Sequence, residues 1–203
     1  MAEEKDKFPS MTALLAQERP GIDYRMSWCR GLPTALVAPH GGKIEPGTSE
    51  LAKAIAADRY SYFSFEGIKS SHNHDLHVTS THYDEPHCLE LLAACDIVVT
   101  LHGCRDVKGM EGAVYPGGLD DSLRDAIRDA LNKSGFKTGE RSDLQGVDKQ
   151  NICNRGRSRK GVQLEISRSL RDKLVAGSPS QNADFAKFIA AVQSAIAAAS
   201  GGH

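Results

Sequence analysis

The chain has 203 residues, of which 40% are hydrophobic and 25% are charged, a composition typical of folded globular proteins. Its 25 basic and 26 acidic side chains nearly cancel, which excludes a general attraction to nucleic acid or to an anionic membrane. Any affinity for a polyanion must therefore be local. The length suits one domain, and we expect residues 1–203 to form it.

The cysteines and the N-terminal segment bear on the cellular compartment. The five cysteines are odd in number and contain no CxxC pair, which predicts reduced thiols rather than disulfides or a thiolate zinc site. The segment MAEEKDKFPS is acidic where a secretory signal has a cationic start, and no run reaches the roughly 18 apolar residues of a membrane span. We therefore expect synthesis in the cytoplasm without a signal peptide.

Short apolar runs alternate with amphipathic segments along the chain. The predicted elements are, in chain order, a strand at 34–39, a helix at 49–58, strands at 60–65 and 76–80, a helix at 86–95, a strand at 96–101, a helix ending near residue 133, a strand at 161–167 and a helix at 181–199. This alternation predicts an α/β fold with three layers. Helices are expected on both faces of a mixed, mostly parallel sheet.

Two of the predicted strands end in the same way. His40 and His102 each follow an apolar run and precede a glycine, and open α/β sheets bind ligands at the carboxyl ends of their strands. Glu45 follows His40 across two glycines, so a tight loop can bring its carboxylate back to the same place. Two imidazoles and a carboxylate form a zinc set that leaves one position open for catalysis. The sequence therefore predicts a metal site at His40, Glu45 and His102.

Other interpretations of these histidines stay open. A histidine at a strand end can cap backbone groups, and a loop glutamate is usually solvated. A second cluster, His72, His74 and His77 with His82 close behind, also has metal-binding side chains. We expect exposed loop positions and supporting roles around the site for this cluster, because no strand ending in glycine precedes it.

Glu165 is the predicted catalytic carboxylate. The run GVQLEIS alternates so that Glu165 lies on the opposite face from Val162, Leu164 and Ile166. Amide cleavage needs a base for the attacking water and a proton for the leaving nitrogen, and one carboxylate can serve both steps. The alternative is a surface glutamate on a strand.

The segment NRGRSRK, which precedes this strand, is strongly basic. Arginine guanidinium groups bind carboxylates in bidentate geometry, so Arg155 and Arg157 are candidates for binding a substrate carboxylate beside Glu165. A solvated basic loop is the alternative. Nucleic-acid binding is less favoured because no aromatic residue interleaves with the charges.

Several ordered motifs resemble one known family. PHGGKIEPGTSELA, LHVTSTHYDEP, LHGC and NICNRGRSRKGVQLEIS, with the spacing between them, resemble the phage-type poly-γ-glutamate hydrolases over roughly Met26 to Leu174. The resemblance implies a zinc carboxypeptidase-like fold and hydrolysis of γ-linked glutamyl amides in the capsular polymer of bacilli. It also implies that Zn²⁺ is held by His40, Glu45 and His102, with Glu165 as general base and acid.

The resemblance implies substrate roles as well. By analogy the pair Asn154 and Arg155 is expected to hold a substrate carboxylate, and Ser80 and His82 in TSTH are expected to line the pocket. The expected partner is the poly-γ-glutamate polymer, with no nucleic acid and no membrane. We expect a monomer that acts on capsule outside the cell after lysis.

Two other functions stay open at this point. One is a zinc amidase or carboxypeptidase acting on peptidoglycan stem peptides, which also contain a γ-glutamyl bond. The other is a capsule-binding module that keeps the fold without catalysis. The joint presence of three ligand residues and Glu165 favours an enzyme.

Overall fold

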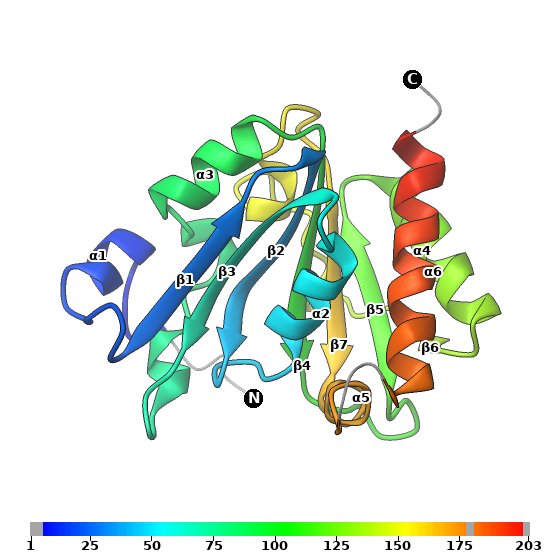
Figure 1. Cartoon of the computed structure of the whole chain (residues 1–203), viewed down its shortest axis with the longest axis horizontal. Helices are drawn as coiled ribbons and strands as arrows, with labels where there is room; N and C mark the ends of the chain where they lie inside the picture. Colours follow the sequence, from blue (N-terminus) through cyan, green and yellow to red (C-terminus); the bar gives the residue numbers. More distant parts are fainter. Residues whose placement is uncertain (1–5, 178–180, 201–203) are drawn as a thin grey trace.

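A computed structural model describes residues 6–177 and 181–200 of the chain. Within these residues the sheet has seven strands in the order β1-β3-β2-β4-β7-β5-β6 (Figure 1). The strands are β1 (Tyr24–Cys29), β2 (Leu32–Gly42), β3 (Tyr60–Gly67), β4 (Ile97–Cys104), β5 (Ala113–Gly118), β6 (Lys137–Thr138) and β7 (Val162–Ser167).

The sheet is mixed, as predicted. β3, β2, β4 and β7 run parallel to one another, whereas the edge strand β1 runs antiparallel to β3, and β5 runs antiparallel to β7 and parallel to β6. Because parallel strands share one direction, the carboxyl ends of β2, β4 and β7 meet at one edge, the lower edge in Figure 1. This is the edge at which open α/β sheets bind ligands.

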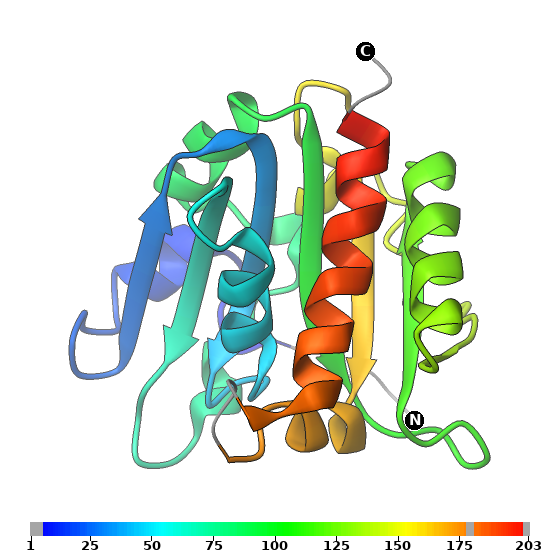
Figure 2. The same ribbon diagram turned by 45° about the vertical axis from the view of Figure 1, so that its right-hand side comes forward.

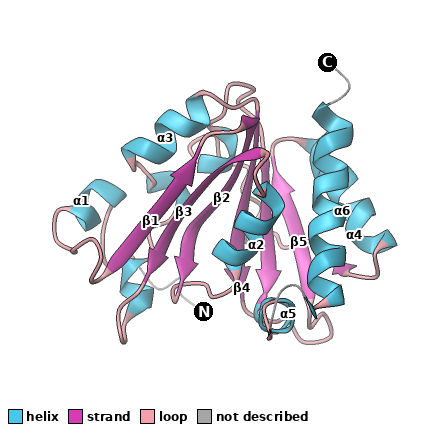
Figure 3. Cartoon of the chain, in the orientation of Figure 1, coloured by secondary structure: helices cyan, strands magenta, loops and turns pink. Residues whose placement is uncertain are grey.

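Helices cover both faces of the sheet, which confirms the three predicted layers (Figures 2 and 3). One face carries α2 (Thr48–Ala56), α4 (Asp121–Lys133) and α6 (Ala183–Ser200), and the other carries α1 (Met11–Leu15) and α3 (Pro86–Ala93). The short α5 (Arg168–Leu174) follows β7 at the carboxyl edge. Single 3-10 turns are η1 (Asn73–Leu76), η2 (Ser80–His82) and η3 (Ile152–Asn154). None of the described helices is long and apolar enough to cross a membrane.

The strand alternation separates two cores. Val162, Leu164 and Ile166 pack beneath α6 with Phe188 and Val192, whereas the intervening residues of β7 face the other side of the sheet. Aliphatic burial of this kind contributes about 1.5–3 kcal/mol per large side chain. The polar face of β7 is buried too, so Glu165 lies inside the protein rather than on its surface.

The predicted strand at 76–80 is wrong, since the segment forms η1, η2 and the turn between them. Its backbone groups are used by side chains rather than by a neighbouring strand. The Val78 carbonyl accepts from His40, and the Thr79 amide donates to Asp6 at 2.6 Å. The strands β1 and β5 were not predicted, because β1 lacks a clean alternation and β5 carries Pro116 and two glycines that normally indicate a turn.

Candidate metal centre

A bulge in β2 turns His40 toward the site. Ala38 pairs with Ser64 and Gly41 pairs with Glu66, so β2 uses one residue more than β3 over this stretch. An inserted residue reverses the side-chain alternation that follows it. Ala38 packs beneath α2, whereas the His40 ring lies on the opposite face, beside Tyr83. The bulge therefore places His40 on the same face as His102.

The Glu45 carboxylate folds back onto His40. Glu45 Oε1 lies 3.3 Å from His40 Nδ1, and the Glu45 amide donates to the His40 carbonyl at 2.8 Å, which closes the loop. His40 Nε2 donates to the Val78 carbonyl at 2.8 Å, so the ring lone pair is on Nδ1. In the described part of the chain this buried Nδ1 has no hydrogen-bond partner. A buried imidazole lone pair without a hydrogen-bond donor is typical of a nitrogen that binds a metal ion.

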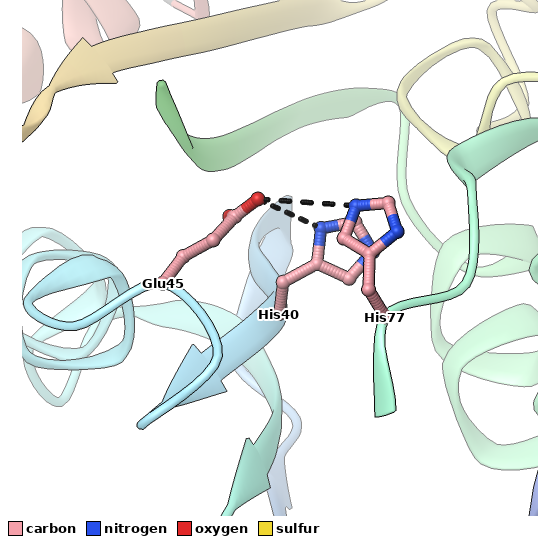
Figure 4. Close-up of side chains that lie close together, drawn as sticks. All are labelled: His40, Glu45 and His77. Carbon is pink, nitrogen blue, oxygen red and sulfur yellow. Dashed lines mark ion pairs between the residues drawn. The ribbon is translucent and has the colours of Figure 1, made fainter. Parts of the chain in front are cut away.

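His77 joins this pair from the turn after η1 (Figure 4). Its Nδ1 lies 2.6 Å from Asp6 Oδ1, and its Nε2 lies 4.0 Å from Glu45 Oε1. Its ring lies against that of His40, with centroids 4.0 Å apart and planes tilted by 33°. Donor atoms of His40, Glu45 and His77 all lie within 4.8 Å of one another. The sequence patterns missed this proximity, because it depends on a turn that joins no strand.

His102 completes the cluster from β4. Its Nδ1 lies 4.0 Å from Glu45 Oε2, and its Nε2 lies 3.4 Å from the hydroxyl of Ser80. Its ring stands edge-on to that of His40, with centroids 5.1 Å apart and planes at 63°. The structure thus places His102 and Ser80 beside His40 and Glu45, whereas the group whose donor atoms all lie within 4.8 Å of one another contains His77 in place of His102.

The residues present fit a divalent metal ion. In each imidazole one nitrogen faces Glu45 and the other contacts a residue outside the cluster. The outside partner is Val78 for His40, Asp6 for His77 and Ser80 for His102. Outer partners of this kind fix the ring orientation and tautomer of metal-binding histidines. Imidazoles with a single carboxylate form the donor set of catalytic zinc sites.

The loop that carries Glu45 is braced by Arg171 of α5. The Arg171 guanidinium is buried and donates to the carbonyls of Ile166 and Pro46, which ties the loop to the end of β7. It lies so close to Gly103 that a Cβ there would be 2.4 Å from the guanidinium carbon. The Gly103 amide donates to Glu45 Oε2 at 2.8 Å. The glycine after His102 is therefore needed for close packing of the ligand loop.

The protonation states suit metal binding. Burial raises the pKa of Glu45, but the neighbouring histidines outweigh it and hold this pKa at about 2. Burial lowers the pKa of His102 to about 3, and repulsion from His40 together with burial lowers the pKa of His77 to about 4. The carboxylate is therefore ionised and both rings are neutral at neutral pH. Burial also opposes the charged form of His40, but Glu45 outweighs it and raises the pKa of His40.

Glu165 lies beside the cluster on the neighbouring strand. It pairs directly with His102 in the register of β4 and β7, and only 5% of its surface is exposed. Burial raises the pKa of Glu165 to about 8, the charge of Glu45 adds to the shift, and Arg141 and Arg171 oppose it. Gln163, two residues back on the same face, donates to Glu165 Oε1 at 3.0 Å. A carboxyl with a pKa near neutrality can both take and give a proton.

The raised pKa predicts a stability difference between metal-free wild type and Glu165→Gln. The folded protein holds a proton on Glu165 that the unfolded chain releases near pH 4.5, so wild-type stability falls as the pH rises from about 4.5 to about 8. Glutamine has no such proton. We expect the variant to match wild type near pH 4 and to become the more stable of the two toward pH 8, with thermal unfolding as the measurement. Parallel curves for the two proteins would show that the Glu165 pKa is ordinary.

Three of the residues expected to bind substrate are engaged with other parts of the protein. Both amide atoms of the buried Asn154 are occupied by backbone groups of Leu119, Gly161, Gly146 and Asp148, so its role is to hold the surrounding loops. Arg157 forms a bidentate pair with Asp96 before the amino end of β4, about 20 Å along the strand from His102. Arg155 donates to the Tyr83 carbonyl.

Histidines outside the cluster are largely at the surface. His72, His74 and His82 are exposed, as expected for loop positions, whereas His77 is not. His74 lies next to His77, with ring centroids 5.7 Å apart. Of the pair expected to line the pocket, Ser80 touches His102 and His82 points to solvent at the end of η2.

The fold and the cluster define an α/β protein with a candidate metal centre at the carboxyl edge of a mixed sheet. Residues 8–191 match the poly-gamma-glutamate hydrolase family, and the chain belongs to that family.

Relatives and solved structures agree with this assignment. The chain is 34% identical to UPF0714 protein YmaC of Bacillus subtilis (strain 168) over 174 residues, covering 83% of this chain and 72% of YmaC. It is 37% identical to the SPbeta prophage-derived UPF0714 protein YoqZ of the same strain, covering 68% of this chain but only 50% of YoqZ. A bacteriophage poly-gamma-glutamate hydrolase has the same fold, with a TM-score of 0.89 and 33% identity over 97% of this chain and 99% of that one. A zinc-free YndL structure superposes with a TM-score of 0.87 at 29% identity, over 96% of this chain and 99% of that one.

Proposed function

We propose that this chain is a zinc-dependent hydrolase that cleaves the γ-glutamyl amide bonds of poly-γ-glutamate. The observation that carries the proposal is the cluster of inward-facing imidazole nitrogens around Glu45, with the buried Glu165 on the next strand. The family assignment and the bacteriophage hydrolase support the substrate. The zinc-free form of YndL supports the metal.

We assign His40, Glu45 and His102 as the zinc ligands. An imidazole lone pair lies in the plane of its ring, so two rings bind one ion only where their planes meet close to both nitrogens. The edge-on rings of His40 and His102, with planes at 63°, meet this condition better than the rings of His40 and His77, whose planes differ by only 33°. His102 also stands on a central strand, whereas His77 lies on a turn. His77, held by Asp6, then lines the site beside the ion.

Zinc at this position supplies Lewis-acid polarisation of the scissile carbonyl and activation of a water molecule. Glu165 takes the proton of the attacking water and returns it to the leaving nitrogen. Gln163 holds Oε1 of Glu165 at 3.0 Å and so orients the carboxylate for both transfers. The burial of Glu165 excludes bulk water from the carboxylate.

Digestion of defined polymers by the zinc-loaded protein tests the proposal. We expect poly-γ-glutamate to be shortened, with new amino groups appearing, while poly-α-glutamate and peptidoglycan stem peptides stay intact. The chelator-treated protein is the control. Cleavage of stem peptides but not of the polymer would contradict the proposed substrate. Polymer binding without cleavage would identify a capsule-binding module.

A further inference from the structure

A poly-γ-glutamate substrate, on which this inference rests, carries a free α-carboxylate on every residue, so its binding calls for a cation beside the scissile bond. The basic segment that the sequence suggested for this role is elsewhere. Arg155, Arg157 and Arg159 line a separate hollow beside α3, and the charge of Arg155 acts on the buried thiol of Cys88.

The cations that act on the Glu165 carboxyl are Arg141 and Arg171, whose charges lower its pKa against the effect of burial. Arg171 is buried, with 4% of its surface exposed, and its guanidinium is engaged with the carbonyls of Ile166 and Pro46. It braces the ligand loop and has little room for a substrate. Arg141 is different, because 23% of its side chain is exposed.

Arg141 is held in place from two sides. Its guanidinium carbon lies 5.7 Å from the centre of the Tyr115 ring, and Tyr115 pairs directly with Glu165 in the register of β5 and β7. Its Nε donates to Asp143 at 2.8 Å, and its Nη2 donates to the other carboxylate oxygen. Among the described residues nothing accepts from Nη1. A fixed guanidinium with one free edge loses little entropy when it binds a carboxylate.

We propose that Arg141 binds the free α-carboxylate of the glutamyl residue next to the scissile amide and so makes the site selective for γ-linked, acidic chains. Tyr115 and Asp143 position the guanidinium, and Nη1 with its exposed edge receives the substrate. Because Asp143 neutralises much of the charge of Arg141, we expect Arg141 to bind small free anions weakly. Recognition then depends on the polymer substrate also occupying the rest of the site.

The test compares a γ-linked glutamate oligomer with the same oligomer carrying α-carboxamides, for zinc-loaded wild type, Arg141→Ala and Arg128→Ala. Arg128 is the matched control, because it pairs with Asp125 on α4 and its side chain is 26% exposed. Charged hydrogen bonds predict that Arg141→Ala raises KM for the acidic oligomer about 10- to 100-fold with kcat within about 3-fold. Wild type and Arg128→Ala should prefer the acidic oligomer, and Arg141→Ala should prefer neither.

Calorimetric binding of the two oligomers separates this inference from the proposed reaction. If wild type binds the acidic oligomer about 10- to 100-fold more tightly than Arg141→Ala does but cleaves neither oligomer, the subsite stands and the proposed reaction falls. If Arg141→Ala keeps the wild-type preference in binding and in KM, the subsite is overturned, whatever the cleavage assay shows. Asp143→Asn keeps the charge of Arg141 but removes its brace, so we expect an intermediate rise in KM. Thermal unfolding checks that each variant is folded.

Discussion

Replacing Glu165 with Gln is expected to lower turnover of poly-γ-glutamate by about 10² to 10⁴-fold, the range typical of general acid and base catalysis. The glutamine keeps the size of the side chain and can still accept the hydrogen bond from Gln163. It cannot take a proton from water or return one to the leaving nitrogen. Initial rates on the zinc-loaded variant measure the loss.

Two controls make this result interpretable. Zinc content must match that of wild type, because a loss of metal also lowers turnover, and the KM should stay close to the wild-type value because substrate still binds. A Glu165→Gln protein that holds its zinc and cleaves at the wild-type rate would make Glu165 a structural residue.

Removing a proposed zinc ligand is expected to have the second large effect. We expect His40→Ala, Glu45→Ala and His102→Ala each to weaken zinc binding by more than about 100-fold, because loss of a partner outside the ligand set typically costs only 10- to 100-fold. His77→Ala should fall within that smaller range. Competition with a chromophoric chelator measures all four, and His72→Ala, at an exposed position, serves as the control.

The pair His77 and His102 decides the ligand set. Both place a nitrogen 4.0 Å from a Glu45 oxygen. The donor spacing favours His77, because its nitrogen lies within 4.8 Å of the donor atoms of both His40 and Glu45, whereas the assignment of His102 depends on ring orientation and on its place on β4. If His77→Ala abolishes binding while His102→Ala is nearly silent, the ion is held by His40, Glu45 and His77. Full occupancy in all four variants would place the metal outside this cluster.

Local patterns predicted the layers and most of the helices, because hydrophobic periodicity reflects which face of an element is buried. They also predicted that His40, Glu45 and His102 meet, since two parallel strands ending in histidine and glycine share one edge of the sheet. The direction of Glu165 followed from the alternation in β7.

The sequence could not predict contacts between residues that lie far apart in the chain. In the linear chain the Asn154 amide and the Arg157 guanidinium have no evident partner. In the fold, the Asn154 amide donates to backbone carbonyls and the Arg157 guanidinium pairs with Asp96. His77 reaches the cluster because Asp6 holds its ring from 71 positions away. Arg141 lies in a polar loop without a periodic pattern, and only the contact with Tyr115 brings it beside Glu165.

The sequence by itself therefore determined the α/β class and the sheet edge at which the candidate site lies, because both depend on local alternation and strand direction. The tertiary structure alone decided which side chains surround that centre. Only the structure shows the bulge in β2 that turns His40 and the burial of Glu165. It also shows that Arg157 lies at the opposite end of β4 from His102. The physical reason is that these outcomes are set by hydrogen bonds and packing between segments far apart in the chain, which no local pattern contains.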